Sequence, residues 1–238
     1  MIQAAIKGNK GKRYAAQRSK VERGRLYPFE EACEVVAKTA SAKFDETVDL
    51  VLRLGVDPRK AEQNVRGSVG LPHGLGKNIR VAVFAKGEKA VEAREAGADL
   101  VGAEDLVEIV KGGSLDFDSV IATPDMMAHV GKVGKILGPR GLMPSPKVGT
   151  VTFDLAPLVK SLKAGRAEYR VDKAGNLHVP AGKASFGGEK IRENVAAILQ
   201  SVVKAKPSTS KGIYLKSGTL SLTMGPGVKL DLSPFRSA

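Results

Sequence analysis

The clearest pattern along the chain is the alternation of apolar and polar residues over residues 44–56 (FDETVDLVLRLGV). Every second side chain is apolar except that of Glu46, and the positions between them are mostly polar or charged. A period of two residues predicts a strand with one buried face. The same alternation returns over residues 213–224, so a second strand of this kind is expected near the end of the chain.

Two further segments have the spacing of helices. Residues 28–38 carry acidic residues in their first turn, and residues 189–205 place apolar side chains on one face before Pro207 ends the pattern. The turn sequence DKAGN at residues 172–176 joins two short apolar segments and predicts a hairpin. The two ends of the chain are therefore expected to form a β-rich α+β domain.

The middle of the chain differs, because short continuous apolar segments alternate there with helical ones. Strands are expected at 79–85, 100–101 and 119–122, and helices at 89–96, at 104–111, from residue 124 and at 155–164. This order predicts a parallel sheet covered by helices on both faces, a three-layer, Rossmann-like α/β domain. Residues 138–149 (GPRGLMPSPKVG) contain three prolines and three glycines and are expected to form a long loop, ordered or disordered.

The glycine-rich stretch at residues 67–76 separates the two patterns, and the first pattern returns from Tyr169. We therefore expect two domains. One is a discontinuous terminal domain made of residues 1–70 and 160–238, and the other is an α/β domain inserted at residues 71–159.

Charge indicates a polyanionic partner, since 38 Lys and Arg against 25 Asp and Glu give a net charge of +13. Nucleic acid is favoured over an anionic membrane surface or no specific partner. Residues 71–159 carry 10 basic and 11 acidic residues, which leaves 28 basic and 14 acidic residues for the terminal domain. Residues 1–25 form a basic arm that is either a solvated tail or a segment that becomes ordered on an anion.

Other functions find little support in the sequence. The single cysteine excludes an intramolecular disulfide framework, and no apolar stretch approaches the ~20 residues of a membrane span. The run GLPHGLGK at residues 70–77 lacks the spacing of a phosphate-binding loop, and the three histidines lie far apart. We therefore expect no enzymatic activity, no metal, no cofactor, no membrane contact and a cytoplasmic location. Aromatic residues are too few for a stacking platform, which favours recognition of a folded RNA by its shape and backbone.

Several short motifs stand in a characteristic order along nearly the whole chain: AKFDET (42–47), DPR (57–59), NVRG (64–67), LPHGLGK (71–77), ATPD (122–125), LGPRGLMP (137–144), GKASF (182–186) and TMGP (223–226). In this order they resemble the bacterial ribosomal protein L1 family. Ser145 stands where the family commonly has Asn, and the two ends of the chain match nothing firm.

The resemblance implies a structural protein of the large ribosomal subunit that binds the stalk helices of the large ribosomal RNA. It also implies help with release of deacylated tRNA from the exit site, repression of its own operon messenger RNA, and an inserted domain that moves on a double-stranded hinge. The RNA-binding positions that it implies are Lys43, Phe44, Glu46, Thr223, Met224 and Gly225, and more loosely Lys183, Ser185 and Phe186. Phe44 and Met224 have an alternative interpretation as core residues, because Phe44 is in phase with the buried face of its strand.

Two other hypotheses stay open from the sequence. One is a nucleotide-dependent enzyme that uses the inserted α/β domain. The other is a free-standing RNA chaperone, which the division of charge alone would permit.

Overall fold

The structure is a computed structural model that describes residues 11–113, 115–146 and 148–236. It divides into two compact units, of which unit 1 comprises Met1–Val65 and Tyr169–Ala238 and unit 2 comprises Arg66–Glu168. The predicted fold class, an α+β domain interrupted by an α/β domain, is confirmed. The first ten residues of the predicted basic arm lie outside the described residues.

The boundaries of the two units differ from those expected at residues 70/71 and 159/160. Residues 66–70 and 160–168 fall in unit 2 rather than in the terminal unit. The helix α7 (Leu155–Lys163) explains part of this difference, because its residue Leu162 is buried in a core cluster of unit 2. With the observed boundaries unit 2 has 14 basic and 12 acidic residues, and unit 1 has 24 basic and 13 acidic ones. Most of the excess positive charge therefore still lies in unit 1.

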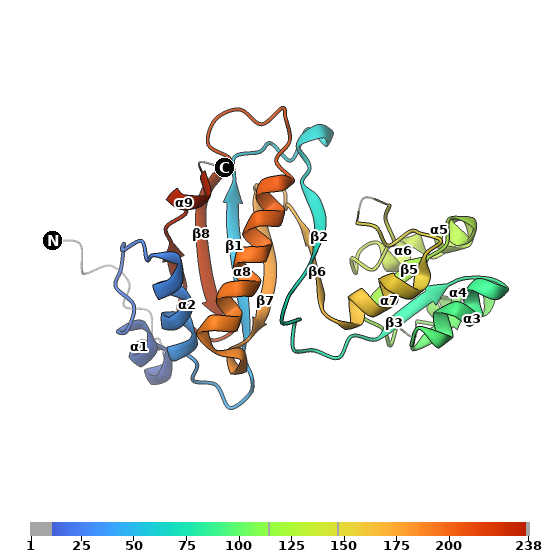
Figure 1. Ribbon diagram of the computed structural model, residues 1–238, viewed down its shortest axis with the longest axis horizontal. Coiled ribbons are helices and arrows are strands. Elements are labelled where there is room, and N and C mark those ends of the chain that lie inside the picture. The colour runs from blue at the N-terminus through green and yellow to red at the C-terminus, as the bar shows by residue number, and fades with distance from the viewer. Residues whose placement is uncertain (1–10, 114, 147, 237–238) are drawn as a thin grey trace. The chain divides into compact units, whose positions relative to one another are not determined.

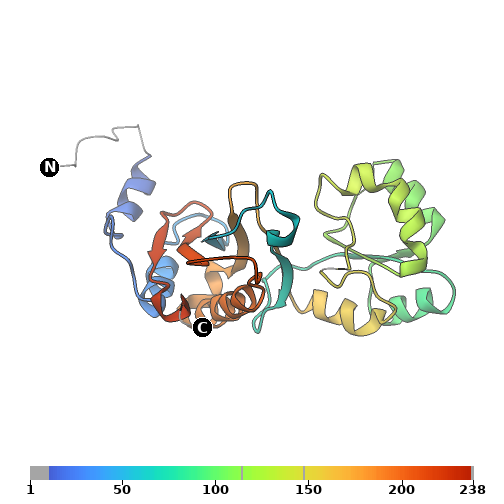
Figure 2. The ribbon, with the colours of Figure 1, turned by 90° about the horizontal axis from the view of Figure 1, so that it is seen from above.

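Unit 1 is built on a four-stranded sheet with the order β7-β1-β8-β9. The strands are β1 (Thr47–Leu54), β7 (Asn176–Lys183), β8 (Leu215–Leu222) and β9 (Val228–Leu230), and all neighbours are antiparallel. The helices α2 (Phe29–Lys38) and α8 (Gly187–Lys204) lie across one face of this sheet (Figures 1 and 2). Alternate residues of β1 are buried against them, as the period of two predicts.

Short elements complete unit 1. They are α1 (Lys12–Arg18) in the basic arm, η1 (Ala61–Gln63), η3 (Ala184–Phe186) and α9 (Ser233–Arg236). Tyr27 connects the arm to the sheet edge, since its backbone amide donates to Lys229 O at 2.9 Å and its carbonyl accepts from Asp231 N at 2.8 Å. The sequence did not indicate β9, because three residues are too short for an alternation to be recognised.

The predicted hairpin forms its turn, but its two arms enter different sheets. Asp172 Oδ1 accepts hydrogen bonds from the backbone amides of Ala174 and Asn176, both at 2.8 Å. After this turn β7 joins the sheet of unit 1, whereas β6 (Arg166–Arg170) pairs with β2 (Arg66–Gly70) in a two-stranded sheet. The strand β2 lies in the glycine-rich stretch, where the sequence predicted only a crossing between domains.

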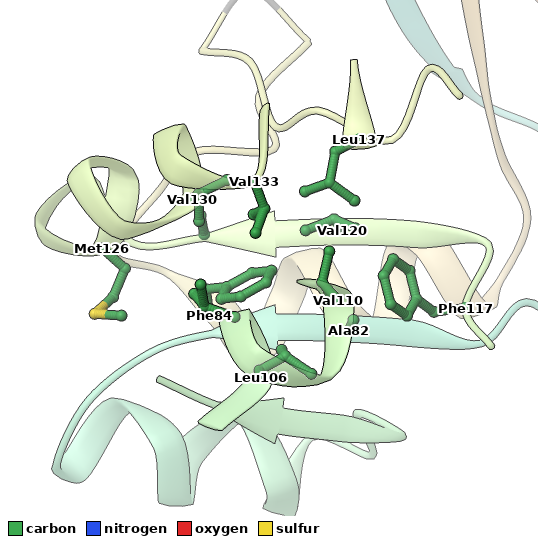
Figure 3. Close-up of a cluster of buried hydrophobic side chains, with 12 residues drawn as sticks. Ala82, Phe84, Leu106, Val110, Phe117, Val120, Met126, Val130, Val133 and Leu137 are labelled. Atoms are coloured by element: carbon green, nitrogen blue, oxygen red, sulfur yellow. The ribbon is translucent and has the colours of Figure 1, made fainter. Parts of the chain in front are cut away.

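Unit 2 has three layers around a parallel sheet with the order β4-β3-β5. Its strands are β3 (Val81–Phe84), β4 (Leu100–Gly102) and β5 (Ser119–Ala122). On one face, Val81 and Val83 pack with α7 and α3 (Glu88–Glu95). On the other, Ala82 and Phe84 pack with α4 (Glu104–Lys111), η2 (Pro124–Met126), α5 (Met127–Lys132) and α6 (Gly134–Leu137), as Figure 3 shows.

Two polar contacts order the long loop at residues 138–149. The guanidinium group of Arg166 in β6 donates to Val148 O at 2.8 Å and also to the hydroxyl of Ser68 in β2. Ser68 Oγ donates to the same carbonyl oxygen at 3.1 Å. The end of the loop is therefore attached to the β2–β6 ladder.

The run GLPHGLGK forms a close backbone contact. Gly74 and Gly165 both have positive φ angles, +66° and +102°, and a Cβ atom on Gly165 would lie 2.4 Å from Gly74 Cα. Only glycine fits such an approach without a shift of backbone. Gly74 is thus explained by packing, in agreement with the interpretation of this run as a structural turn.

Within the described part of the chain, no helix is long and apolar enough to cross a membrane. The same residues contain no group of three His, Cys, Asp or Glu side chains placed to hold a metal ion.

Replacement of Phe84 by alanine tests the independence of the two cores. Phe84 is fully buried in unit 2, so Phe84→Ala should destabilise that unit by about 3–5 kcal/mol. Phe153→Ala is the matched control, because Phe153 is 52% exposed in the same unit and its loss should change stability by less than about 0.5 kcal/mol. Calorimetry of Phe84→Ala should show a lower unfolding temperature for unit 2 and an unchanged unfolding temperature for unit 1. Equal shifts of both transitions would show that the units unfold together.

Candidate nucleic-acid interface

Three segments meet at one end of the sheet of unit 1. Because β1 is antiparallel to both β7 and β8, the start of β1 lies beside the ends of these two strands. Thr47 is paired with Lys183, Thr223 N donates to Thr47 O at 3.1 Å, and Ala184 N donates to Glu46 O at 2.8 Å. We call this group of residues, Lys43–Thr47, Lys183–Phe186 and Thr223–Gly225, the strand-end cluster. It contains all nine positions that the resemblance implies.

Glu46 is the buried centre of the strand-end cluster, with only 1% of its surface exposed. Its Oε1 accepts from the backbone amides of Ser41 and Ala42, at 3.0 and 2.8 Å, and its Oε2 accepts from Met224 N at 2.9 Å. One carboxylate therefore fixes the loop before β1 and the turn after β8. The geometry gives Glu46 a positioning role, and its direct contact with RNA stays a prediction.

The ionised form of Glu46 is favoured in the folded protein. Burial opposes ionisation, but hydrogen bonds from the backbone amides of Ser41, Met224 and Ala42 outweigh it, and the positive charge of Arg13 contributes, so that the pKa of this carboxyl is lowered. Hydrogen bonds from backbone amides thus stabilise the charge of this buried carboxylate.

A second set of hydrogen bonds joins the start of β1 to the ends of β7 and β8. Lys183 Nζ donates to Thr47 Oγ1 at 2.9 Å, and the hydroxyl of Ser185 donates to Asp45 Oδ2 at 2.7 Å. Thr223 Oγ1 accepts from Thr47 N at 3.1 Å. Most polar side chains of the strand-end cluster are thus held in place by the protein itself, as a preorganised recognition surface requires.

Two apolar side chains of the strand-end cluster face solvent. Phe44 is 55% exposed and Met224 is 47% exposed. The alternative interpretation of these two as core residues is therefore wrong. Phe44 is in phase with the buried face of β1, but it lies before Thr47, the first paired residue of the strand. The alternation therefore does not predict whether Phe44 is buried.

Glycine and phenylalanine are packed together at the end of β7. A Cβ atom on Gly182 would lie 2.9 Å from the ring of Phe186, so the ring of this half-buried residue rests on the glycine. Gly225 is restricted in the same way, because a Cβ atom there would lie 3.0 Å from Leu222 Cβ. The glycines of the motifs therefore serve internal packing as well as any approach of RNA.

The sequence missed that the described part of the basic arm lies beside the strand-end cluster. Residues 11–14, which include the start of α1 at Lys12, and the turn Thr223–Gly225 line a hollow of about 650 Å³. Lys12 and Arg13 thereby add positive charge next to exposed Met224. The sequence could not indicate where α1 packs. This helix has seven residues and no buried side chain, so it shows no recognisable apolar face.

The opposite end of unit 1 carries a second basic surface, which the sequence also left unassigned. Gly55 N donates to Tyr214 O at 2.6 Å, and Leu54 N donates to Gly175 O at 2.9 Å, so three loops meet there. These loops and the adjoining end of β1 present six exposed cations, which we call the loop-end cluster: Arg53, Arg59, Lys60, Lys173, Lys206 and Lys211. Unit 1 thus has separate basic surfaces at its two ends.

In a comparison with models of protein families, the Ribosomal protein L1p/L10e family matches residues 36–226 of the chain. This range includes all of unit 2 and every residue of the strand-end cluster.

Replacement of Glu46 by glutamine should loosen the strand-end cluster, because the amide nitrogen of glutamine cannot accept from a backbone amide. We expect a loss of about 1–3 kcal/mol at pH 7. Since the folded-state pKa is lowered, the stabilisation by Glu46 is present above its ordinary value of 4.5 and disappears as the pH falls through the folded-state pKa. Urea unfolding at pH 7 and in acid measures this difference. If the difference in unfolding free energy between wild type and Glu46→Gln were as large in acid as at pH 7, the stabilising role of the Glu46 carboxylate would be contradicted.

Proposed function

The chain belongs to the ribosomal protein L1p/L10e family, and on this premise we propose that the strand-end cluster is the surface that holds the stalk region of the large ribosomal RNA. Proteins of this family are structural constituents of the large ribosomal subunit, bind ribosomal RNA and are not enzymes. The hypothesis of a nucleotide-dependent enzyme is therefore wrong for this chain. Membership of a ribosomal family also speaks against the free-standing RNA chaperone.

The observation that carries the proposal is the pair of exposed apolar side chains, Phe44 and Met224, beside Thr223 and Lys43. Flat apolar groups stack on unpaired bases or ribose, and hydroxyl and ammonium groups bind 2′-hydroxyls and phosphates. Because Glu46 fixes both loops from beneath, RNA would meet a surface that needs little ordering on binding.

We further propose that the loop-end cluster contacts a second RNA, the deacylated tRNA that leaves the exit site. Exposed cations at the far end of unit 1 supply non-specific contacts with phosphate, which suit a transient partner. The ladder of β2 and β6, at the junction of the two units, is the proposed hinge. A ribosome-bound protein of this kind works in the cytoplasm.

Repression of the protein's own messenger RNA belongs to the same proposal. A messenger segment that folds like the ribosomal site would compete for the strand-end cluster, since one surface can hold only one of the two RNAs at a time. A filter-binding competition between the two RNAs tests this, and specific binding of the messenger segment that persists in excess stalk ribosomal RNA would exclude it.

Removal of the exposed apolar side chains should weaken RNA binding without a loss of stability. Contacts between a base and such a side chain contribute about 1–3 kcal/mol, so Phe44→Ala and Met224→Ala should each lower affinity for the stalk ribosomal RNA roughly tenfold. Ile213→Ala is the matched control, because Ile213 is 61% exposed at the other end of unit 1. Unchanged affinity in both variants, with wild-type melting temperatures, would remove the strand-end cluster as the binding surface.

Salt should reduce the affinity for the stalk ribosomal RNA only in part. About six phosphate contacts would give a slope of the logarithm of affinity against the logarithm of salt of about −4 to −5. Hydrogen bonds and apolar contacts are not screened, so preference over a scrambled RNA should persist at high salt. Titrations from low to high ionic strength measure both quantities, and a preference that vanishes at moderate salt would indicate a generic basic protein.

A further inference from the structure

We propose that Asp45 is a specificity-determining residue of the strand-end cluster. Its carboxylate would keep phosphate groups away from the centre of the surface and accept hydrogen bonds from RNA hydroxyl or amino groups. This inference rests on the proposed function, and it concerns which RNA is accepted rather than whether RNA binds.

The carboxylate of Asp45 is exposed but fixed in direction. Its Oδ1 accepts from the backbone amide of Ser185 at 3.1 Å, and its Oδ2 accepts from the hydroxyl of Ser185 at 2.7 Å. Each oxygen of a carboxylate has about two acceptor sites, so each keeps one for a ligand. A fixed, partly occupied acceptor of this kind suits recognition, whereas a freely rotating surface carboxylate would not.

The charge of Asp45 is not neutralised by its neighbours. Within the residues that the structure describes, no lysine or arginine forms an ion pair with it. Lys183 lies nearby, but its ammonium group is bonded to Thr47 Oγ1 at 2.9 Å and to the backbone carbonyl of Asp45 at 3.5 Å. Lys43 is two residues away along the chain and exposed. A negative charge therefore stands near Lys183 and two residues from Lys43, on a unit that otherwise carries a large positive excess.

This arrangement has a direct consequence for a phosphate backbone. Phosphate can approach Lys43, but against Asp45 it meets a like charge with no donor to offer. A 2′-hydroxyl or an exocyclic amino group can donate to the same carboxylate. Only an RNA whose fold places donors opposite Asp45 and phosphates opposite the lysines satisfies both conditions, which is how a repulsive group produces specificity.

A purely structural role for Asp45, as an anchor for Ser185, is the competing explanation. Asp45→Asn separates the two, because the amide oxygen still accepts from Ser185 N and the hydroxyl of Ser185 can turn to accept from the amide nitrogen. The anchor remains while the charge is lost. Ser185→Ala does the opposite, since it removes one anchoring bond and keeps the charge.

The test uses the full chain and two RNAs of equal length, the stalk ribosomal RNA fragment and a scrambled sequence. Asp45→Asn should raise the affinity for scrambled RNA about fivefold, the size of one exposed like-charge contact. It should not raise the affinity for the stalk fragment, so the ratio of the two affinities should fall at least fivefold. Ser185→Ala should leave the affinity for scrambled RNA at its wild-type value, because the charge of Asp45 remains. Glu62→Gln, in the exposed η1 helix, makes the same change of net charge elsewhere in unit 1 and should leave the ratio unchanged.

The outcomes separate this inference from the proposed function. A wild-type protein that binds both RNAs equally would overturn the proposed function. A selective wild type whose ratio changes in Asp45→Asn no more than in Glu62→Gln would overturn the role of Asp45 alone. A ratio that falls in Asp45→Asn only because the stalk fragment binds more weakly, with no gain in affinity for scrambled RNA, would assign Asp45 to the structural role instead.

Discussion

The candidate interface depends on one constraint, the pairing of β1 on both of its edges. Because β7 and β8 both run antiparallel to β1, their ends are brought to its beginning, although about 40 residues separate these ends along the chain. Glu46 lies just before β1 and accepts hydrogen bonds from backbone amides of the loop before β1 and of the turn after β8. The register of one central strand thus decides which three segments of the sequence meet. The carboxylate of Glu46 then holds the loop before β1 and the turn after β8 together.

Local patterns in the sequence were sufficient for much of the fold. The alternation over residues 44–56 and the apolar face of residues 189–205 correspond to β1 and α8, because both elements bury one face against the same core. Which strands pair with each other was harder to predict from the sequence. The turn at Asp172 formed as expected, yet β6 pairs with β2, over 90 residues earlier in the chain. Such pairing depends on contacts distant in sequence, which no local period reports.

The family resemblance pointed to the residues of the strand-end cluster. It did not distinguish residues that face solvent, and could contact RNA, from residues that hold the surface in shape. Glu46 looked like an interruption of an apolar face, and the structure explains it as a buried acceptor for three amides. Phe44 looked like part of that face and is exposed. The two cases have different origins. Glu46 keeps the buried phase and is exceptional only in being polar, whereas Phe44 leaves that phase because it precedes the first paired residue of β1, Thr47.

The way in which Glu46 is satisfied also bears on how the surface responds to its surroundings. A loop fixed by an exposed ion pair loosens in high salt, because mobile ions screen the attraction. Here the charge is buried and its partners are backbone amides, which salt screens far less. The positions of Phe44, Asp45 and Met224 should therefore stay constant over the range of ionic strength in which contacts with phosphate weaken. Selectivity and total affinity then depend on different parts of unit 1, the fixed centre of the strand-end cluster and the cations around it.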